Sequence, residues 1–352
     1  MQLKNQDFSK LKKLKIQGVI GDDPLLLNQL AILLSKTKNL EEVDLRYCRL
    51  TELPKFIGQL RHLKTLNLEW NDLTSIPESI GNLSKLKVLN LHGNSLKSLP
   101  KTIENLKNLI ELDIGVNLCF RRTLPKGIGN LQSIGNLRNL EKLVICANHL
   151  NKIPSYIGNL KKLKHLDVSY NAITSIHENI WNLENLEVLD LGYTGLKSLP
   201  TSVSKLGNLE YLCLYNLELE SFPDSLKNLK KLKTLIIGGK ITAIPNWVFE
   251  LSNLKGLGLS HSPLVSIPEK IERLKNLESL SIDSNNLLKQ WPSSLEKLKN
   301  LKKLMLDIYQ QKKWSQSIEN LKKVNKNLKI FRPAKCVIQR QFFEDTPLKQ
   351  SN

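Results

Sequence analysis

The chain has 352 residues, of which 41% are hydrophobic and 24% are charged, and its formal net charge is +19. This composition is typical of a soluble folded protein. No apolar run approaches the roughly 18 residues that a membrane-spanning helix needs, and no secretory signal is visible at the N-terminus. We therefore expect a cytoplasmic protein, with export or secretion as the alternative if a leader segment has been removed.

The cysteine count bears on disulfide bonds, and the net charge bears on the kinds of partner. Five cysteines are an odd number, and no CxxC pair occurs, which argues against a disulfide framework. A large positive charge suggests nucleic acid, anionic lipid or an acidic protein as a partner. Lysine supplies 43 of the 52 positive residues, however, and arginine, which binds phosphates and guanine edges better, only 9. This bias disfavours nucleic acid, and a solvated lysine-rich surface is the simpler explanation.

Residues 8–39 are predicted to form an N-terminal cap. Leu11, Leu14 and Ile16 begin a strand. Asp22 or Asp23 then caps a helix that has Pro24 at its first position. The apolar face of this helix consists of Leu26, Leu27, Leu30, Leu33 and Leu34.

From Leu40 onward the string LxxLxLxxNxLxxIPxxIxxL recurs, mostly at intervals of 23 residues. Copies begin at Leu40, Leu63, Leu86, Leu109, Leu140, Leu163, Leu186, Leu209, Leu232, Leu254, Leu277 and Leu301. The LxLx half alternates apolar and polar residues, which favours a short strand with one buried face. A single repeat cannot bury that face alone, so neighbouring repeats must stack and share a core.

The asparagine of each repeat falls where the chain turns inward. Its amide can satisfy buried main-chain groups of adjacent coils. This slot holds Asn71, Asn94, Asn117, Asn148, Asn171 and Asn285. Thr194 and Ser262 can replace the amide in part, whereas Leu217 and Lys240 cannot. We therefore expect local irregularity at Leu217 and Lys240.

The repeat that begins at Leu109 takes 31 residues to reach Leu140, eight more than the norm. Its extra residues lie in "LCFRRTLP" and in a doubled "IGNL". Insertions in solenoids form loops that often bind partners. Phe120, Arg121 and Arg122 are thus possible loop contacts, and a tolerated duplication is the alternative.

The C-terminal residues 328–352 are predicted to form a cap and tail. The last coil can be covered by Leu328, Ile330, Val337, Ile338, Phe342 and Phe343.

This pattern, with ten of the fourteen prolines in one slot, resembles leucine-rich repeat proteins of the 23-residue LPxxIxxL class. That class is common in bacteria and is similar to the repeat regions of Ras-suppressor and scribble-type proteins. The resemblance implies an α/β solenoid curved into a horseshoe, with a concave parallel sheet of about 12–14 short strands. Short helical or irregular turns would line the convex side, and the N-terminal cap would contain a helix.

The domain organisation follows from the same resemblance. We predict one leucine-rich repeat domain over 1–352, made of the cap 8–39, the repeats 40–327 and the C-terminal cap and tail 328–352. The family shares a shape and a habit of binding proteins, and its bacterial members make an exported effector or a surface ligand-binder plausible.

The third, fifth and seventh residues of LxxLxLxxN point away from the core on the concave face. Over the seven repeats from Leu40 to Leu186 they include seven acidic and two basic side chains. The eighth residues, at the rim, add aromatic rings. The predicted partner-binding set is Tyr47, Trp70, Tyr170, Tyr193 and Tyr215 for apolar contact, with Asp44, Glu69, Asp113, Asp167 and Asp190 to select basic groups. Aromatic residues that only pack along their row are the alternative.

The positive charge gathers on the flank where the strands begin, and again between Lys302 and Arg340. Such a ridge could bind nucleic acid or an anionic membrane. It has almost no aromatic residues between the lysines, so base stacking is not indicated.

No chemistry of an enzyme stands out. No phosphate-binding GxxxxGK[ST] occurs, and no histidines or cysteines stand at metal spacing. We predict no cofactor, no metal and no catalysis. The predicted function is a protein–protein interaction module whose partner has a basic or mixed surface; the alternative is an electrostatic binder of nucleic acid or anionic membrane through the lysine flank and the C-terminal basic stretch.

Overall fold

The computed structural model describes residues 10–16, 18, 20–21, 23–117 and 131–333. These residues belong to two compact units, 1–186 and 187–352, and each unit is described by itself. The single domain over 1–352 stays a prediction. None of the helices in the described part of the chain has the length and hydrophobicity of a membrane span.

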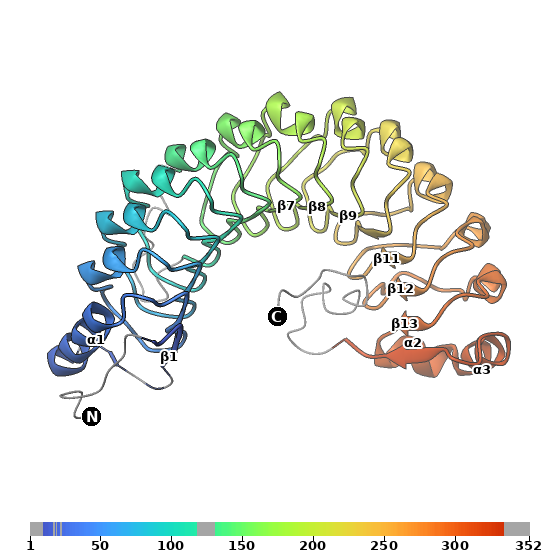
Figure 1. Cartoon of the computed structure of the whole chain (residues 1–352). Helices are drawn as coiled ribbons and strands as arrows, with labels where there is room; N and C mark the ends of the chain where they lie inside the picture. Colours follow the sequence, from blue (N-terminus) through green and yellow to red (C-terminus); the bar gives the residue numbers. More distant parts are fainter. Residues whose placement is uncertain (1–9, 17, 19, 22, 118–130, 334–352) are drawn as a thin grey trace. The chain divides into compact units, whose positions relative to one another are not determined.

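Unit 1 is a stack of parallel strands, each paired with the next strand in the sequence (Figure 1). Its strands are β1 (Lys13–Lys15), β2 (Glu42–Asp44), β3 (Thr65–Asn67), β4 (Val88–Asn90), β5 (Glu111–Asp113), β6 (Lys142–Val144) and β7 (His165–Asp167). Five-residue 3₁₀ turns follow most of them: η1 (Lys55–Gln59), η2 (Glu78–Asn82), η3 (Lys101–Asn105), η4 (Gln132–Asn136), η5 (Ser155–Asn159) and η6 (Glu178–Asn182).

Unit 2 repeats this arrangement with parallel strands in sequence order. Its strands are β8 (Val188–Asp190), β9 (Tyr211–Cys213), β10 (Thr234–Ile236), β11 (Gly256–Gly258), β12 (Ser279–Ser281), β13 (Lys303–Met305) and β14 (Lys329–Phe331). Its 3₁₀ turns are η7 (Thr201–Lys205), η8 (Asp224–Asn228), η9 (Asn246–Glu250), η10 (Glu269–Arg273) and η11 (Ser293–Lys297).

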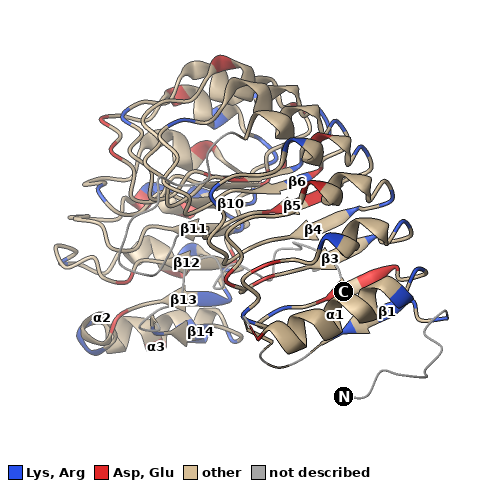
Figure 2. Ribbon diagram, turned by 90° about the vertical axis from the view of Figure 1, so that its left-hand side faces the viewer, with Lys and Arg blue, Asp and Glu red and all other residues tan. Residues whose placement is uncertain are grey.

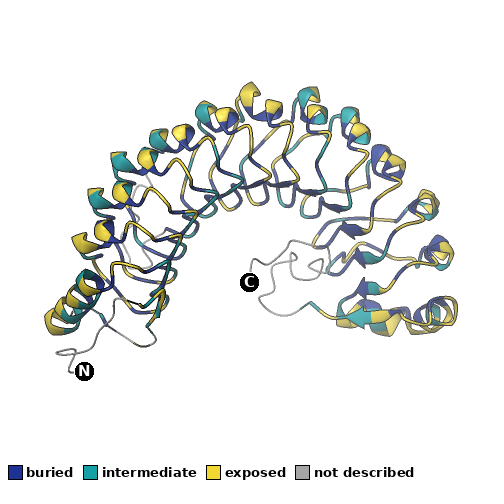
Figure 3. Cartoon of the chain, viewed as in Figure 1, coloured by how far each residue is buried: buried dark blue, intermediate teal, exposed yellow. Residues whose placement is uncertain are grey.

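The repeated leucines form the core of each unit. The strands pair without a register shift, so that Leu66, Leu89 and Leu112 lie in one column, and all three are fully buried. Residues on either side of this column alternate with it and point to the opposite side of the sheet. Exposed positions recur on the outer turns (Figure 3). Proline begins most of these turns because its fixed φ suits that position and no N–H is needed there.

The asparagine slot works as the sequence predicts. Asn71 Nδ2 donates to the carbonyl oxygens of Leu45 (2.9 Å) and Leu68 (2.8 Å). Asn71 Oδ1 accepts from the main-chain N–H of Cys48 (3.2 Å) and Leu50 (2.9 Å) in the preceding repeat. Each amide thus joins two coils, and we call the series of slot residues the asparagine ladder.

The strand and the capped helix that the sequence predicts near the N-terminus are confirmed, whereas the bounds 8–39 of the cap stay a prediction. α1 (Pro24–Lys36) begins with Asp23, whose side chain accepts from the N–H of Leu25, and Pro24 is the first helical residue. Leu30 and Leu34 of its apolar face are buried. The strand that precedes it is β1, paired with β2.

At the other end two helices replace the last 3₁₀ turn, which the repeat pattern does not predict. They are α2 (Ile308–Lys313) and α3 (Ser315–Val324). Leu328 is buried just before β14. The predicted covering residues Val337, Ile338, Phe342 and Phe343 lie outside the described residues.

Candidate protein-binding surface

In strands β2–β13 the middle residue is buried in the core, and the residues on either side point the other way. We call the surface that these outer residues and the eighth residues of the repeats form the strand face of each unit. The eighth residue has a left-handed backbone in repeat after repeat, with φ between 50° and 57° where it is not glycine: Tyr47, Trp70, Val116, Ala147, Tyr170, Tyr193, Asn216, His261 and Ser284. This conformation reverses the chain just before the asparagine slot.

In unit 1 three of these left-handed positions carry exposed aromatic rings. Tyr47 is 60% exposed, Tyr170 44% and Trp70 38%. A left-handed backbone is unfavourable for bulky residues and suits glycine, and glycine does take this place at Gly93, with φ +65°. The exposed fractions confirm the prediction that these three rings face solvent. Because glycine takes the same place at Gly93, the backbone conformation does not require an aromatic residue there.

Trp70 rests on the glycine of the next repeat. A Cβ on Gly93 would lie 2.6 Å from Trp70 Cδ2, so the indole ring lies directly over this glycine. The ring also meets His92 edge to face, with ring centroids 5.7 Å apart. One side of the indole is thus supported by the protein while the rest stays open to solvent. Such a fixed, half-open ring can bury area in a contact at low entropy cost.

His92 links this ring to the acidic residues. Its Nδ1 lies 3.1 Å from Asp113 Oδ1. Burial lowers the pKa of His92, but the hydrogen bond to Asp113 and the negative charges of Asp113 and Glu69 outweigh it, so the pKa of His92 is raised overall. The repeat pattern places His92 on the strand face, but its pairing across two repeats is visible only in the structure.

The fifth residues of the repeats have a structural role that the sequence analysis did not consider. Their side-chain oxygen accepts from the main-chain N–H two residues further on, which stabilises the turn at the strand end. The acceptors and donors are Asp44 and Arg46, Asn67 and Glu69, Asn90 and His92, Asp113 and Gly115, Asp167 and Ser169, and Asp190 and Gly192. Part of the acidic character of the strand face is therefore explained by turn geometry.

Several of the predicted acidic contacts already have partners within the chain. Arg46 binds Asp44 with two hydrogen bonds, from Nε to Oδ1 at 3.1 Å and from Nη2 to Oδ2 at 2.9 Å. Asp113 pairs with His92. Among the described residues none forms an ion pair with Glu69, which lies next to Trp70 in the chain. Acidic and basic segments are interleaved along both units (Figure 2).

Asp167 is different because it is buried. It is only 4% exposed, and its Oδ1 accepts from the N–H and the hydroxyl of Ser169. The predicted loop contacts Phe120, Arg121 and Arg122 lie outside the described residues.

In unit 2 the predicted contact residues differ in their exposure to solvent. Tyr193 is 38% exposed, whereas Tyr215 is only 8% exposed and Asp190 is buried as well. The Tyr215 ring packs between Tyr193, at a centroid distance of 5.1 Å, and His261, at 6.4 Å. Tyr215 therefore supports Tyr193 from behind and offers little surface of its own. The partner-binding role of the whole predicted set stays a prediction.

Several lysines of the flank form ion pairs with glutamates of the same chain. Lys64 and Lys164 pair with Glu41 and Glu141 of the preceding repeats at 2.5 and 2.8 Å, and Lys233 pairs with Glu210 at 2.7 Å. Further pairs join Lys255 and Lys302 to Glu278. Such exposed pairs contribute little to stability, but they reduce the charge that the flank can offer to a polyanion.

The comparisons with known proteins agree with this architecture. The family model described as "Leucine-rich repeat region" matches residues 26–154 and 141–257, and a single leucine-rich repeat model matches residues 276–298. The chain belongs to the leucine-rich repeat family. Members of this family are typically scaffolds for protein–protein interaction. No curated protein sequence matches this leucine-rich repeat protein.

Solved structures similar to this chain include two bacterial proteins and one plant receptor ectodomain. A leucine-rich repeat protein of Leptospira interrogans is 32% identical, covers 85% of this chain and 80% of its own, and superposes with a TM-score of 0.65. The internalin InlF of Listeria monocytogenes is 21% identical, with coverages of 90% and 97% and a TM-score of 0.61. The ectodomain of the Arabidopsis thaliana receptor kinase GASSHO1/SCHENGEN3, solved in complex with Casparian strip integrity factor 2, is 22% identical, with coverages of 85% and 42% and a TM-score of 0.56.

Proposed function

We propose that this leucine-rich repeat protein binds a protein partner through the strand face of unit 1, around Tyr47, Trp70 and Tyr170. One observation carries the proposal: exposed rings occupy backbone positions that favour glycine. Grouped exposed aromatic residues are typical of protein contacts. The family's general role as an interaction scaffold supports the same conclusion, as does the plant ectodomain that was solved with a protein ligand.

The charges refine the partner's chemistry. Asp44 and Asp113 are bound by Arg46 and His92, so they offer less negative charge than their number suggests. Glu69 is not paired by any described residue and stands beside Trp70. The partner best suited to this surface presents an apolar side chain for the Trp70 ring and a Lys or Arg beside it for Glu69. In unit 2 Tyr193 is proposed as a further contact.

The test uses purified full-length chain as bait. Proteins that it captures are identified, one candidate is purified, and its Kd is measured for the wild type and for Trp70→Ala. Loss of a central aromatic contact raises the Kd about tenfold or more. The matched control is Phe56→Ala, because Phe56 is 43% exposed but lies on the outer turn η1. Equal Kd values for wild type and Trp70→Ala would overturn the proposal.

Tyr47→Gly separates binding from folding. Tyr47 has φ +57° and is 60% exposed, so glycine removes backbone strain of about 1 kcal/mol and little packing. We expect this variant to be as stable as the wild type or slightly more stable, yet to bind the partner more weakly. A Tyr47→Gly variant that unfolds more easily would mean that the ring is there for stability.

A further inference from the structure

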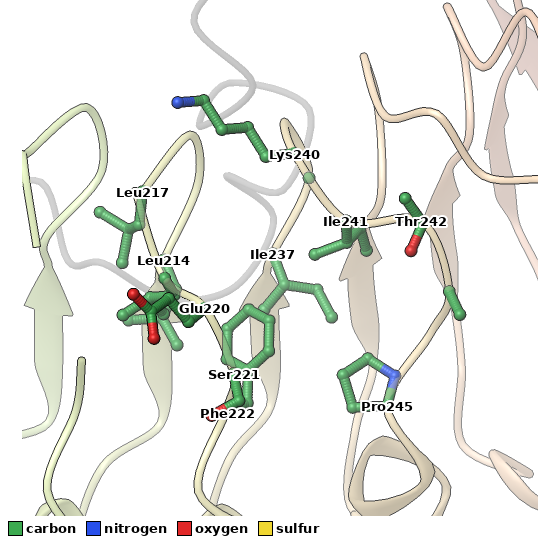
Figure 4. A pocket seen from close by; sticks show the side chains of 13 residues that line it. Leu214, Leu217, Glu220, Ser221, Phe222, Ile237, Lys240, Ile241, Thr242 and Pro245 are labelled. Carbon is green, nitrogen blue, oxygen red and sulfur yellow. The ribbon is translucent and has the colours of Figure 1, made fainter. Parts of the chain in front are cut away.

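The asparagine ladder is broken in two consecutive repeats of unit 2. The slot residues there are Leu217 and Lys240, where the sequence analysis expects irregularity. Leu217 has no amide, and the Lys240 ammonium binds Glu218 Oε1 at 2.6 Å. Figure 4 shows the Lys240 side chain pointing away from the other labelled side chains. The ladder is restored at Asn285, whose Nδ2 donates to the carbonyls of Leu259 and Ile282.

The break leaves a particular set of main-chain groups without their usual bonds. By analogy with Asn71, an amide at position 240 would donate to the carbonyls of Leu214 and Ile237 and accept from the N–H of Leu217 and Leu219. No described residue forms a hydrogen bond with any of these four groups. Leu214, Leu217 and Ile237 are buried residues and Leu219 is half-buried. Main-chain groups without a partner are costly where water does not reach them. Two acceptors and two donors are therefore available at one place.

A pocket lies at this break. Leu214, Leu217, Leu219 and Ile237, the residues that carry the four groups, all line it, and its volume is about 200 Å³. An apolar cavity of about 150 Å³ in another protein holds a benzene molecule, so this space is large enough for one small ring. In Figure 4 the Phe222 ring lies beside Ile237 and forms part of an apolar side of the pocket. The lining also contains polar residues: Glu220, Ser221, Lys240 and Thr242.

We propose that this pocket binds a small molecule with a compact apolar body and one primary carboxamide. A carboxamide has two N–H donors for the two main-chain carbonyls and one oxygen that can accept from the two main-chain N–H groups. It would replace the missing asparagine amide between the two repeats. A carboxylate has no donor for the carbonyls, and an amine ligand has no acceptor for the N–H groups. Because Lys240 is bound to Glu218 and points away, the pocket offers no free cation to favour an acid.

The first test measures binding of benzamide to the full-length wild type by titration calorimetry and by NMR of the Leu217 and Leu219 amides. We expect saturable binding, shifts of both amide signals and slower hydrogen exchange at both positions. Benzoate, of nearly the same shape, binds at least about tenfold more weakly, because it lacks the two donors. Absence of saturation by benzamide, or equal affinity for benzoate, would overturn the proposal.

The second test restores the ladder with Lys240→Asn. The new amide occupies the four main-chain groups, so benzamide binding weakens at least about tenfold while the melting temperature rises. The matched control, Lys197→Asn, makes the same change at an exposed lysine that does not line the pocket and leaves binding unchanged. If Lys240→Asn binds benzamide as the wild type does, the carboxamide does not use these groups. The amide shifts of the wild type decide the question if a variant does not fold.

Discussion

Replacing Asn71 by leucine tests the ladder directly. Leucine occupies the same slot at Leu217, where it is 5% exposed, so it fits the space. The substitution removes five hydrogen bonds at once: from Nδ2 to the carbonyls of Leu45, Leu68 and, at 3.4 Å, Glu69, and to Oδ1 from the N–H of Cys48 and Leu50. The damage is thus confined to the junction between two neighbouring repeats of unit 1.

The magnitude follows from these contacts. A net contribution of about 1 kcal/mol per hydrogen bond gives a loss of about 4 kcal/mol for the four shorter bonds, and the long bond to Glu69 adds little. Burial of the leucine side chain offsets about 1.5 kcal/mol of this loss. The free energy of unfolding should therefore fall by about 2–3 kcal/mol. With a urea dependence of about 3 kcal/mol per molar, the unfolding midpoint moves down by about 1 M.

Urea unfolding followed by circular dichroism measures the midpoint, and hydrogen exchange at Cys48 and Leu50 locates the effect. Asn108→Leu is the matched control, because Asn108 is exposed and its Nδ2 makes one bond, to the carbonyl of Ser84. Its effect should stay within about 0.5 kcal/mol. If Asn71→Leu were as stable as Asn108→Leu, the ladder would not stabilise the stack, and the argument for the pocket at Lys240 would fail with it.

Three further predictions concern unit 1. Gly93→Ala should lower the free energy of unfolding by at least about 1 kcal/mol, because the new methyl would lie 2.6 Å from Trp70 Cδ2 and the backbone φ is +65°; thermal melts measure it. NMR titration should show the pKa of His92 above its ordinary value and lowered by Asp113→Asn. A histidine whose pKa is raised in the folded state stabilises the fold at a pH below its unfolded pKa of about 6.5. This stabilisation is lost as the pH rises through the folded pKa, so Asp113→Asn should lower the stability more at pH 5 than at pH 8. Burial raises the pKa of Tyr156 to about 12, so the fold should lose stability as the pH rises from about 10 through 12, and Tyr156→Phe should flatten that dependence.

Much of the fold could be read from the sequence because each repeat makes the same demand. The leucine column, the proline-started turns and the asparagine ladder depend only on spacing, and so does the break at Leu217 and Lys240. The helices α2 and α3 were missed because the last repeat was expected to continue the pattern. A signal was present: Asp307 and Gln310 form a capping box, which indicates a helix start.

The surface was harder to predict, because spacing gives the position of a side chain but not its neighbours. Trp70 is the eighth residue of its repeat and Tyr215 the seventh, and each lies on a glycine of the next repeat, Gly93 and Gly238. Trp70 stays partly exposed, whereas Tyr215 is enclosed by Tyr193 and His261. The number of acidic residues on the strand face overstates the negative charge that it offers to a partner, because Asp44 is bound by Arg46 of its own repeat.

Turn geometry and binding compete for the same positions, and this competition makes the aromatic rings informative. The fifth residue of a repeat needs an oxygen to accept from the turn, so an acidic residue there needs no further explanation. The eighth residue needs a left-handed backbone, for which glycine is the least costly choice. Tyr47 and Trp70 meet that need poorly, and they leave 60% and 38% of their surface exposed, so packing alone does not account for them. Of the two features that the sequence brings to the strand face, the rings therefore carry more evidence for a binding partner than the carboxylates do.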